Sequence, residues 1–342
     1  MKKTNGKIVF GVIVAAAVLS LIVSGVSKKN TPKFSSSIQI NGEEIDFDDE
    51  DFGGLGKLFS MASGSNPNEN PKKVSGPYIS VININGVISE ANRTYNQKWV
   101  MKQIKKAAGD SKNQGILLKI DSPGGTVYES DETYLALLNY KEQTKRPVYA
   151  YFGSLAASGG YYIGCAADVI FANRNCLTGS IGVIAGQSVD ATELMKKIGV
   201  KMTTITAGKN KNMGNYNSVL TEEQKAIMQS IADEAYEQFT EIVAESRGMK
   251  LADVQSLADG RIYTAKQAKQ NGLVDEVCTI SQAQKYIQEK HGLEIGFPEF
   301  KYKYEENLFD MIYGAASFVE NPTASIYSIL GESGARCLYL YQ

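Results

Sequence analysis

A serine between small residues is the strongest candidate for chemistry in this chain. Ser158 lies in the stretch Ala156–Tyr162, which reads AASGGYY and follows the apolar run Val148–Phe152. At a turn from a strand into a helix, its hydroxyl can act as a nucleophile, and the glycines let a substrate backbone approach closely. The amide of Gly159 would lie at the helix N-terminus, where it can stabilise a developing oxyanion. An ordinary helix start capped by Ser158 would show the same pattern.

A glycine-rich turn is the second candidate element. The segment Asp121–Thr126 reads DSPGGT, ends the apolar run Gly115–Asp121 and precedes a helical pattern. Its glycine amides could donate to the same oxyanion and pair with an extended peptide. Considered alone, the segment is more typical of an ordinary turn between a strand and a helix.

A serine nucleophile needs a general base, and the histidine content limits the choice. The single histidine, His291, ends a helical pattern at a glycine, which is typical of a surface cation. Lysine is the obvious substitute. A solvated lysine has a pKa of about 10.4 and is ineffective at neutral pH, whereas burial lowers that pKa. Lys209 and Lys211 follow the β-prone run Thr203–Ala207; spacing does not decide between them, and solvated loop lysines are the commoner case.

The elements that must position these residues alternate between strands and helices. Buried strands are predicted at Tyr78–Ile84, Gly115–Asp121, Val148–Phe152 and Val169–Ala172. Helices are predicted at Trp99–Ala108, Asp131–Gln143, Ala157–Cys165, Thr192–Ile198, Thr221–Arg247, Ala265–Gln270 and Gln282–Glu289. This alternation predicts an α/β domain with a mostly parallel sheet.

The amino-terminal segment predicts a membrane anchor. Residues 8–26 carry no charge and are long enough to cross a bilayer as a helix. Lysines flank both ends, so the orientation signal is weak, and we expect the amino terminus inside. A cleaved signal peptide ending near Val23–Gly25 is the alternative. The predicted location is the cell membrane, single-pass, with an extracytoplasmic catalytic domain.

Composition divides the chain into further parts. Residues 1–7 form the predicted cytoplasmic start, and residues 27–76, acidic and then rich in glycine, serine and asparagine, form a predicted flexible linker. Residues 77–295 form the predicted catalytic domain and residues 296–342 a carboxyl-terminal extension. The net charge of −1 gives no sign of nucleic-acid binding. The cysteines (Cys165, Cys176, Cys278 and Cys337) show no metal-ligand spacing, so no metal or cofactor is predicted.

Four stretches together resemble the signal peptide peptidase A family, in the single-repeat form of Gram-positive bacteria. They are Asp121–Gly125, Ala156–Tyr162, Thr178–Val183 and Asp259–Val277. The resemblance covers residues 77–284 and the amino-terminal anchor.

This resemblance implies roles for individual residues. Ser158 would be the nucleophile, and Lys211, third after Gly208, would be the general base. Ser180 would orient that lysine, and the amides of Gly125 and Gly159 would hold the oxyanion.

The resemblance also implies a fold and a reaction. The fold would be the crotonase/Clp-protease type of α/β spiral, assembled into dome-like homo-oligomers in which serine and lysine come from neighbouring subunits. The reaction would be hydrolysis of remnant signal peptides. The alternatives are a catalytically inactive, membrane-anchored scaffold that binds peptides, and a crotonase-like acyl-CoA enzyme.

The carboxyl-terminal tail itself looks like a substrate. Residues 335–342 are mostly apolar and end in LYLYQ. We expect this tail to add as a strand in a neighbour's groove, as a self-inhibitor or self-substrate. Simple packing on an oligomer surface is the alternative.

Overall fold

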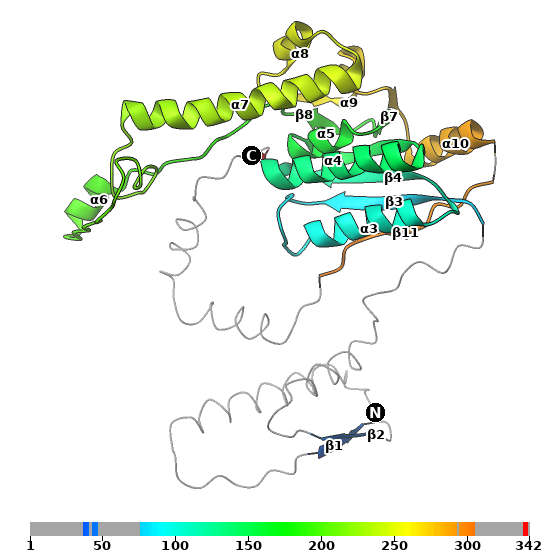
Figure 1. Cartoon of the computed structure of the whole chain (residues 1–342), viewed down its shortest axis with the longest axis horizontal. Helices are drawn as coiled ribbons and strands as arrows, with labels where there is room; N and C mark the ends of the chain where they lie inside the picture. Colours follow the sequence, from blue (N-terminus) through cyan, green and yellow to red (C-terminus); the bar gives the residue numbers. More distant parts are fainter. Residues whose placement is uncertain (1–36, 41–42, 47–75, 293, 305–337, 341–342) are drawn as a thin grey trace, which may run out of the picture. The chain divides into compact units, whose positions relative to one another are not determined.

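The structure is a computed structural model that describes residues 37–40, 43–46, 76–292, 294–304 and 338–340 (Figure 1). The predicted anchor at residues 8–26 lies outside these ranges. Among the described helices, none combines the length and apolar composition that crossing a bilayer requires.

The chain divides into two compact units, residues 1–66 and 67–342. In the first unit, β1 (Ser37–Ile40) and β2 (Glu43–Asp46) form an antiparallel hairpin inside the stretch predicted as a linker. The Asn41-Gly42 dipeptide that joins them is a strong hairpin signal, which the surrounding acidic composition obscured.

The second unit is built on a mostly parallel sheet, as predicted. Its strand order is β10-β7-β6-β4-β3-β11, and every pair along this path is parallel. These strands are β3 (Tyr78–Asn85), β4 (Asn113–Ser122), β6 (Val148–Ala157), β7 (Val169–Ala172), β10 (Glu276–Val277) and β11 (Glu299–Phe300). Because β11 pairs with β3, the sheet extends past the domain boundary expected at residue 295.

Short strands extend the sheet near the glycine-rich turns. β8 (Leu177–Gly179) runs parallel to β6, and β9 (Ile262–Thr264) runs antiparallel to β8. β5 (Gly124–Thr126) pairs with β12 (Leu338–Leu340). The sequence predicted neither β5, β8 nor β9, whereas the tail that contains β12 was expected to add as a strand.

Helices lie at each of the predicted positions, and a further helix over Leu251–Leu257 was not predicted. They are α3 (Gln97–Gly109), α4 (Val127–Thr144), α5 (Gly159–Gly164), α6 (Thr192–Lys197), α7 (Glu222–Arg247), α8 (Leu251–Leu257), α9 (Ala265–Gln270) and α10 (Ile280–His291). A capping box begins α7: the Thr221 side chain accepts from the backbone amide of Gln224, and the Gln224 side chain accepts from the backbone amide of Thr221.

The sheet is buried on both faces. Along β3, Ile82 and Ile84 belong to one apolar cluster, whereas Ile79 and Val81 belong to another that includes Ile287 of α10. Period-two alternation between two apolar clusters is expected of a parallel sheet with helices on both sides.

A part of the chain that we call the arm, residues 184–238, differs from this body. It contains α6 and the first part of α7 and extends away from the sheet (Figure 1), and none of its residues is buried. The β-prone run Thr203–Ala207 forms no strand, because it lies without a strand partner in the described chain, and Ile205 is 95% exposed. Other exposed apolar side chains of the arm are Val189, Leu194, Ile198, Val200, Met202, Val219 and Ile231.

Candidate active site

Ser158 occupies the predicted turn between a strand and a helix. β6 ends at Ala157 and α5 begins at Gly159, and Ser158 between them has φ 53° and ψ −117°. Among the described non-glycine residues, positive φ occurs at Lys145, Ser158 and Ser180. Two of these three are predicted catalytic residues. Backbone strain of this kind is typical of functional positions, where the surrounding structure must enforce it.

Close packing enforces the turn. The Ser158 amide donates to the Gly179 carbonyl at 2.8 Å, and the Tyr162 amide donates to the Ser158 carbonyl at 2.9 Å. A Cβ on Gly160 would lie 3.1 Å from the Ser122 carbonyl oxygen, so α5 begins directly against the end of β4. The small residues of the AASGGYY stretch therefore allow α5 and β4 to pack closely.

The Ser158 hydroxyl is buried without a partner. The residue is 1% exposed, and its Oγ forms no hydrogen bond with any described residue. Buried side-chain hydroxyls are normally hydrogen-bonded, and leaving one unpaired costs about 1–3 kcal/mol. An orphaned hydroxyl at a strained turn is a reason to assign it a chemical role.

Ser180 lies beside this turn. β6 and β8 pair so that Ala157 is opposite Gly179, and Ser158 and Ser180 each follow at the same edge. Ser180 is buried, and its amide donates to the Arg261 carbonyl at 2.8 Å. The structure thus brings these two predicted site residues together.

The DGR turn at residues 259–261 supports Ser180 from behind. Hydrogen bonds from the Arg261 guanidinium and amide lower the pKa of Asp259 to about 2. A Cβ on Gly179 would lie 2.7 Å from the Tyr263 ring, so this crossing of β8 and β9 needs glycine. The stretch Asp259–Val277, one of those that carry the family resemblance, therefore holds the Ser180 backbone in place.

Gly125 lies on β5, which the segment at Ile88 clamps. The Ile88 amide donates to the Gly124 carbonyl at 2.8 Å, and the Thr126 amide donates to the Ile88 carbonyl at 2.9 Å. A Cβ on Gly125 would lie only 1.8 Å from the Ile88 carbonyl oxygen. Sequence reasoning missed Ile88, because its role depends on a contact between distant segments.

The other edge of β5 carries the carboxyl-terminal strand. β12 pairs antiparallel with β5, with Leu338 opposite Thr126, Tyr339 opposite Gly125 and Leu340 opposite Gly124. β12 also lies close to α4 and α5. The expected strand addition by the tail therefore occurs, although within one chain rather than in a neighbour's groove. Because β12 runs antiparallel to β5, its last residue, Leu340, lies opposite Gly124, the first residue of β5.

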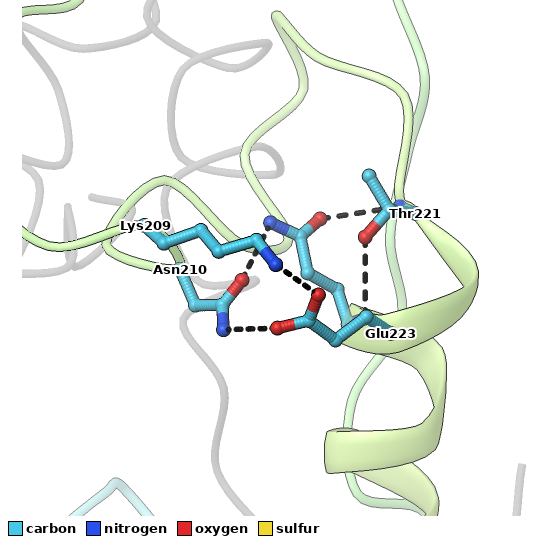
Figure 2. A network of polar contacts seen from close by, with 5 residues as sticks. Lys209, Asn210, Thr221 and Glu223 are labelled. Carbon is cyan, nitrogen blue, oxygen red and sulfur yellow. Dashed lines mark hydrogen bonds and ion pairs between the residues drawn. The ribbon is translucent and has the colours of Figure 1, made fainter.

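The two candidate lysines differ in their surroundings. Figure 2 shows Lys209 in an ion pair with Glu223, which also accepts a hydrogen bond from the side-chain amide of Asn210 at 3.3 Å. Lys209 is thereby tied to the N-terminus of α7. Lys211 lies in the exposed turn after Gly208, and its amide donates to the Gly208 carbonyl at 3.2 Å.

No lysine reaches the serine within the described part of one chain. The Lys211 side chain has no hydrogen bond or ion pair with a described residue, and the Ser158 hydroxyl has none either. The structure thus assembles Ser158, Gly159, Ser180 and Gly125 at one edge of the sheet and leaves Lys211 on the arm.

The remaining titratable groups lie elsewhere. His291 ends α10 before the left-handed Gly292, as predicted, and its Nε2 lies 3.3 Å from the Tyr149 hydroxyl. Burial lowers the pKa of His291, so it is less of a surface cation than expected. Burial raises the pKa of Cys165 and of Cys176 to about 12, which makes both thiols unreactive. Within the described ranges, no cluster of three or more ligand side chains could hold a metal ion.

Comparison with known proteins places this arrangement among peptidases. The family model described as peptidase family S49 matches residues 140–294. The chain is 33% identical over 277 residues to "Putative signal peptide peptidase SppA" of Enterococcus faecium, covering 79% of this chain and 76% of that protein. It is 37% identical to "Putative protease slr0021" of Synechocystis, covering 63% of this chain and 75% of the relative. It is 31% identical to "Protease 4" of Haemophilus influenzae, covering 60% of this chain and 33% of the relative.

Proposed function

Because the chain belongs to peptidase family S49, which its similarity to signal peptide peptidase A establishes, we propose that it is a Ser/Lys endopeptidase that hydrolyses released signal peptides. One observation carries the proposal. An extended segment, β12, already lies on β5 beside a strained, buried serine whose hydroxyl has no partner. A peptide held as an added strand presents its backbone carbonyls in a fixed register to such a nucleophile.

The chemistry is acyl transfer. The neutral amine of Lys211 takes the proton of Ser158 as Oγ attacks a peptide carbonyl carbon. The amides of Gly125 and Gly159 hold the oxyanion, and Ser180 orients the amine. The lysine then protonates the leaving amine, and water activated by the same lysine releases the acyl group and restores Ser158. No cofactor or metal takes part.

The lysine comes from a second copy of the chain. Three features of one chain support this: the unpartnered Ser158 hydroxyl, the exposed Lys211 and the apolar side chains of the arm. Contiguous exposed apolar surface is typical of a protein interface. A homo-oligomer in which one arm delivers Lys211 to a neighbour's Ser158 would bury both the amine and the apolar side chains.

The proposed location of the catalytic domain is the membrane surface. The predicted anchor at residues 8–26 would hold the catalytic domain at the extracytoplasmic surface, where signal peptides released from preproteins remain. Apolar peptides of this kind fit a site at which the apolar carboxyl-terminal tail of the same chain is already bound as a strand.

Hydrolysis of a synthetic signal peptide tests the proposal. The full chain in detergent should cleave it, and Ser158→Ala and Lys211→Met should each reduce kcat by about 10³-fold or more. Lys209→Met is the matched control and should stay within about threefold, because its partner Glu223 is exposed. The wild-type rate should rise with pH as the lysine loses its proton.

Two results would contradict the proposal. Peptide binding without any turnover by the wild type would indicate the scaffold alternative. Loss of activity in Lys209→Met with full activity in Lys211→Met would assign the base to the other lysine.

A further inference from the structure

A buried tyrosine joins the helix that follows the nucleophile to the helix of the arm. Tyr162 lies on α5, is fully buried, and donates its backbone amide to the Ser158 carbonyl. Its hydroxyl donates to Asp131 of α4 at 2.6 Å and accepts from the side-chain amide of Gln238 of α7 at 2.6 Å. One phenol oxygen therefore connects three helices, and one of its partners belongs to the arm.

Gln238 lies at the point where α7 leaves the core. The buried residues of α7 are Phe239, Thr240 and Val243, and all of them follow Gln238. The Phe239 ring packs against the Tyr162 ring with the centroids 5.0 Å apart. A short packed stretch anchors a helix but still allows it to tilt. A hydrogen bond beside that stretch restrains the tilt, because its strength depends on its angle.

The other end of the exposed part of α7 holds the turn that carries the proposed base. Asn210, which precedes Lys211, donates to the Glu223 carboxylate at 3.3 Å and accepts from the Gln224 side chain at 3.3 Å. Lys209 adds an ion pair with Glu223 (Figure 2). Several bonds therefore share this attachment, so the loss of one leaves the turn at the start of α7.

The length of α7 makes its direction important for the position of Lys211. At 1.5 Å per residue, Glu222 and Gln238 are about 24 Å apart along the helix axis. A tilt of about 5° at Gln238 would therefore move the start of α7 by about 2 Å. A misplacement of about 1 Å in a catalytic group can lower the rate by about 100-fold.

We propose that Tyr162 and Gln238 are positioning residues that set the direction of α7 and thereby place Lys211 for the Ser158 of a neighbouring chain. The proposal rests on the proposed function and deepens it, because it names the contact that orients the base. Asp131 accepts the phenol proton, which leaves a lone pair of the Tyr162 oxygen for Gln238. Although Tyr162 lies next to the serine turn of its own chain, its hydroxyl serves the site of the neighbour.

Mixed oligomers test this separation. Ser158→Ala chains supply only lysine, and Lys211→Met chains supply only serine; the two are co-expressed with different tags and purified by both. Tyr162→Phe is placed in one or the other chain, and hydrolysis of a synthetic signal peptide is measured at saturation. We expect about a fivefold loss when the lysine-supplying chain carries it and less than about a twofold loss when the serine-supplying chain does, as for removal of one hydrogen bond.

Tyr161→Phe is the matched control for the tyrosine. It removes the neighbouring buried hydroxyl of α5, which donates to the Leu273 carbonyl at 2.8 Å instead of bonding to the arm. Any loss from Tyr161→Phe should therefore be the same in whichever chain carries it. A weakened fold alone would not produce the asymmetry expected of Tyr162→Phe.

Gln238→Ala tests the same contact from the arm. Gln238 is exposed, so its replacement leaves the packed core unchanged, and it should reproduce the asymmetry of Tyr162→Phe. Gln229→Ala is its control on the same helix, because the Gln229 side chain donates to Asp233 within the exposed part of α7. This control should change hydrolysis by less than about twofold in either chain.

The outcomes separate the positioning role from the peptidase proposal. Equal losses in both mixtures, a loss confined to the serine-supplying chain, or no loss would overturn the positioning role and leave the peptidase intact. A reference mixture without Tyr162→Phe that gives no active mixed oligomer would overturn delivery of the lysine between chains, and the positioning role with it. Cleavage by the wild type would still support the peptidase in that case.

Discussion

The sheet and the helices packed on it, which we call the body, differ from the arm in how far their side chains are buried. In the body, both faces of the sheet are buried, and the turn at Ser158 is fixed by contacts with β4 and β8. In the arm, residues 184–238, no residue is buried and Ile205 is 95% exposed. One chain therefore fixes the Ser158 turn within a core and carries Lys211 on a segment without a core.

This difference indicates how the arm is stabilised. Fully burying one large aliphatic side chain contributes about 1.5–3 kcal/mol. The arm exposes several such side chains, among them Leu194, Ile198 and Ile205, so covering them in an assembly would offset the cost of ordering the loop. The same contact would desolvate the turn that carries Lys211. Assembly and activation of the base would then be a single event.

Mixing two inactive variants gives the largest expected effect and tests the comparison directly. Ser158→Ala chains keep Lys211, and Lys211→Met chains keep Ser158. If each site takes its serine from one body and its lysine from a neighbour's arm, co-assembly in equal amounts should restore about a quarter of the sites. Peptide hydrolysis should then rise by more than about 100-fold over either variant alone.

A negative result would be equally clear. Chains with different affinity tags show whether mixed oligomers have formed. If they form and remain inactive, serine and lysine belong to the same chain, and the division between body and arm has no catalytic meaning.

Gly125→Ala gives the next largest effect and concerns the body alone. The added Cβ would meet the Ile88 carbonyl, which must move, at a cost of about 1–3 kcal/mol in the free energy of unfolding. Hydrolysis should fall together with the stability, because β5 holds the bound strand and Gly125 is the proposed oxyanion donor. Chemical denaturation and the peptide assay measure the two effects.

Gly109→Ala is the matched control. Gly109 ends α3, is exposed, and would bring its new Cβ within 4 Å of no other group. This substitution should stabilise the chain by about 0.5–1 kcal/mol without changing hydrolysis. If the two variants unfolded alike, the clamp at Ile88 would not constrain β5.

The same division explains what the sequence could predict. β7 was predicted at its observed bounds, and β3, β4 and β6 within a few residues, because strands buried on both faces appear as continuous apolar runs. The Ser158 turn was predictable from its small residues. By contrast, β5 is three residues long, and its pairing depends on distant contacts with Ile88 and β12.

The arm was the less predictable region for a physical reason. β-branched residues favour strands only where a partner strand exists, and Thr203–Ala207 has none in the described chain. In the proposed assembly, the surroundings of Lys211 depend on contacts with a second chain. The sequence therefore identified Lys209 and Lys211 as candidate bases, but it did not predict which groups surround each lysine.

Glu223→Gln gives the smallest expected effect and separates the two lysines. A hydrogen bond from Lys209, which has the larger effect, and one from Asn210 lower the pKa of the Glu223 carboxyl below its usual value of 4.5. The pair therefore stabilises the fold above that value and stops doing so as the pH falls through the lowered pKa. At neutral pH it is intact but exposed, so its removal should leave the thermal midpoint unchanged.

The pH–rate profile of Glu223→Gln distinguishes Lys211 from Lys209 as the general base. If Lys211 is the base, the profile of Glu223→Gln should coincide with that of the wild type, because among the described residues the Glu223 carboxylate accepts hydrogen bonds only from Lys209 and Asn210 (Figure 2). If Lys209 were the base, loss of the carboxylate that holds its ammonium form would move the rise in rate to lower pH. Glu222→Gln, which breaks the neighbouring pair with Lys225, is the control and should shift neither profile nor midpoint. A shift confined to Glu223→Gln would assign the base to Lys209 instead of Lys211.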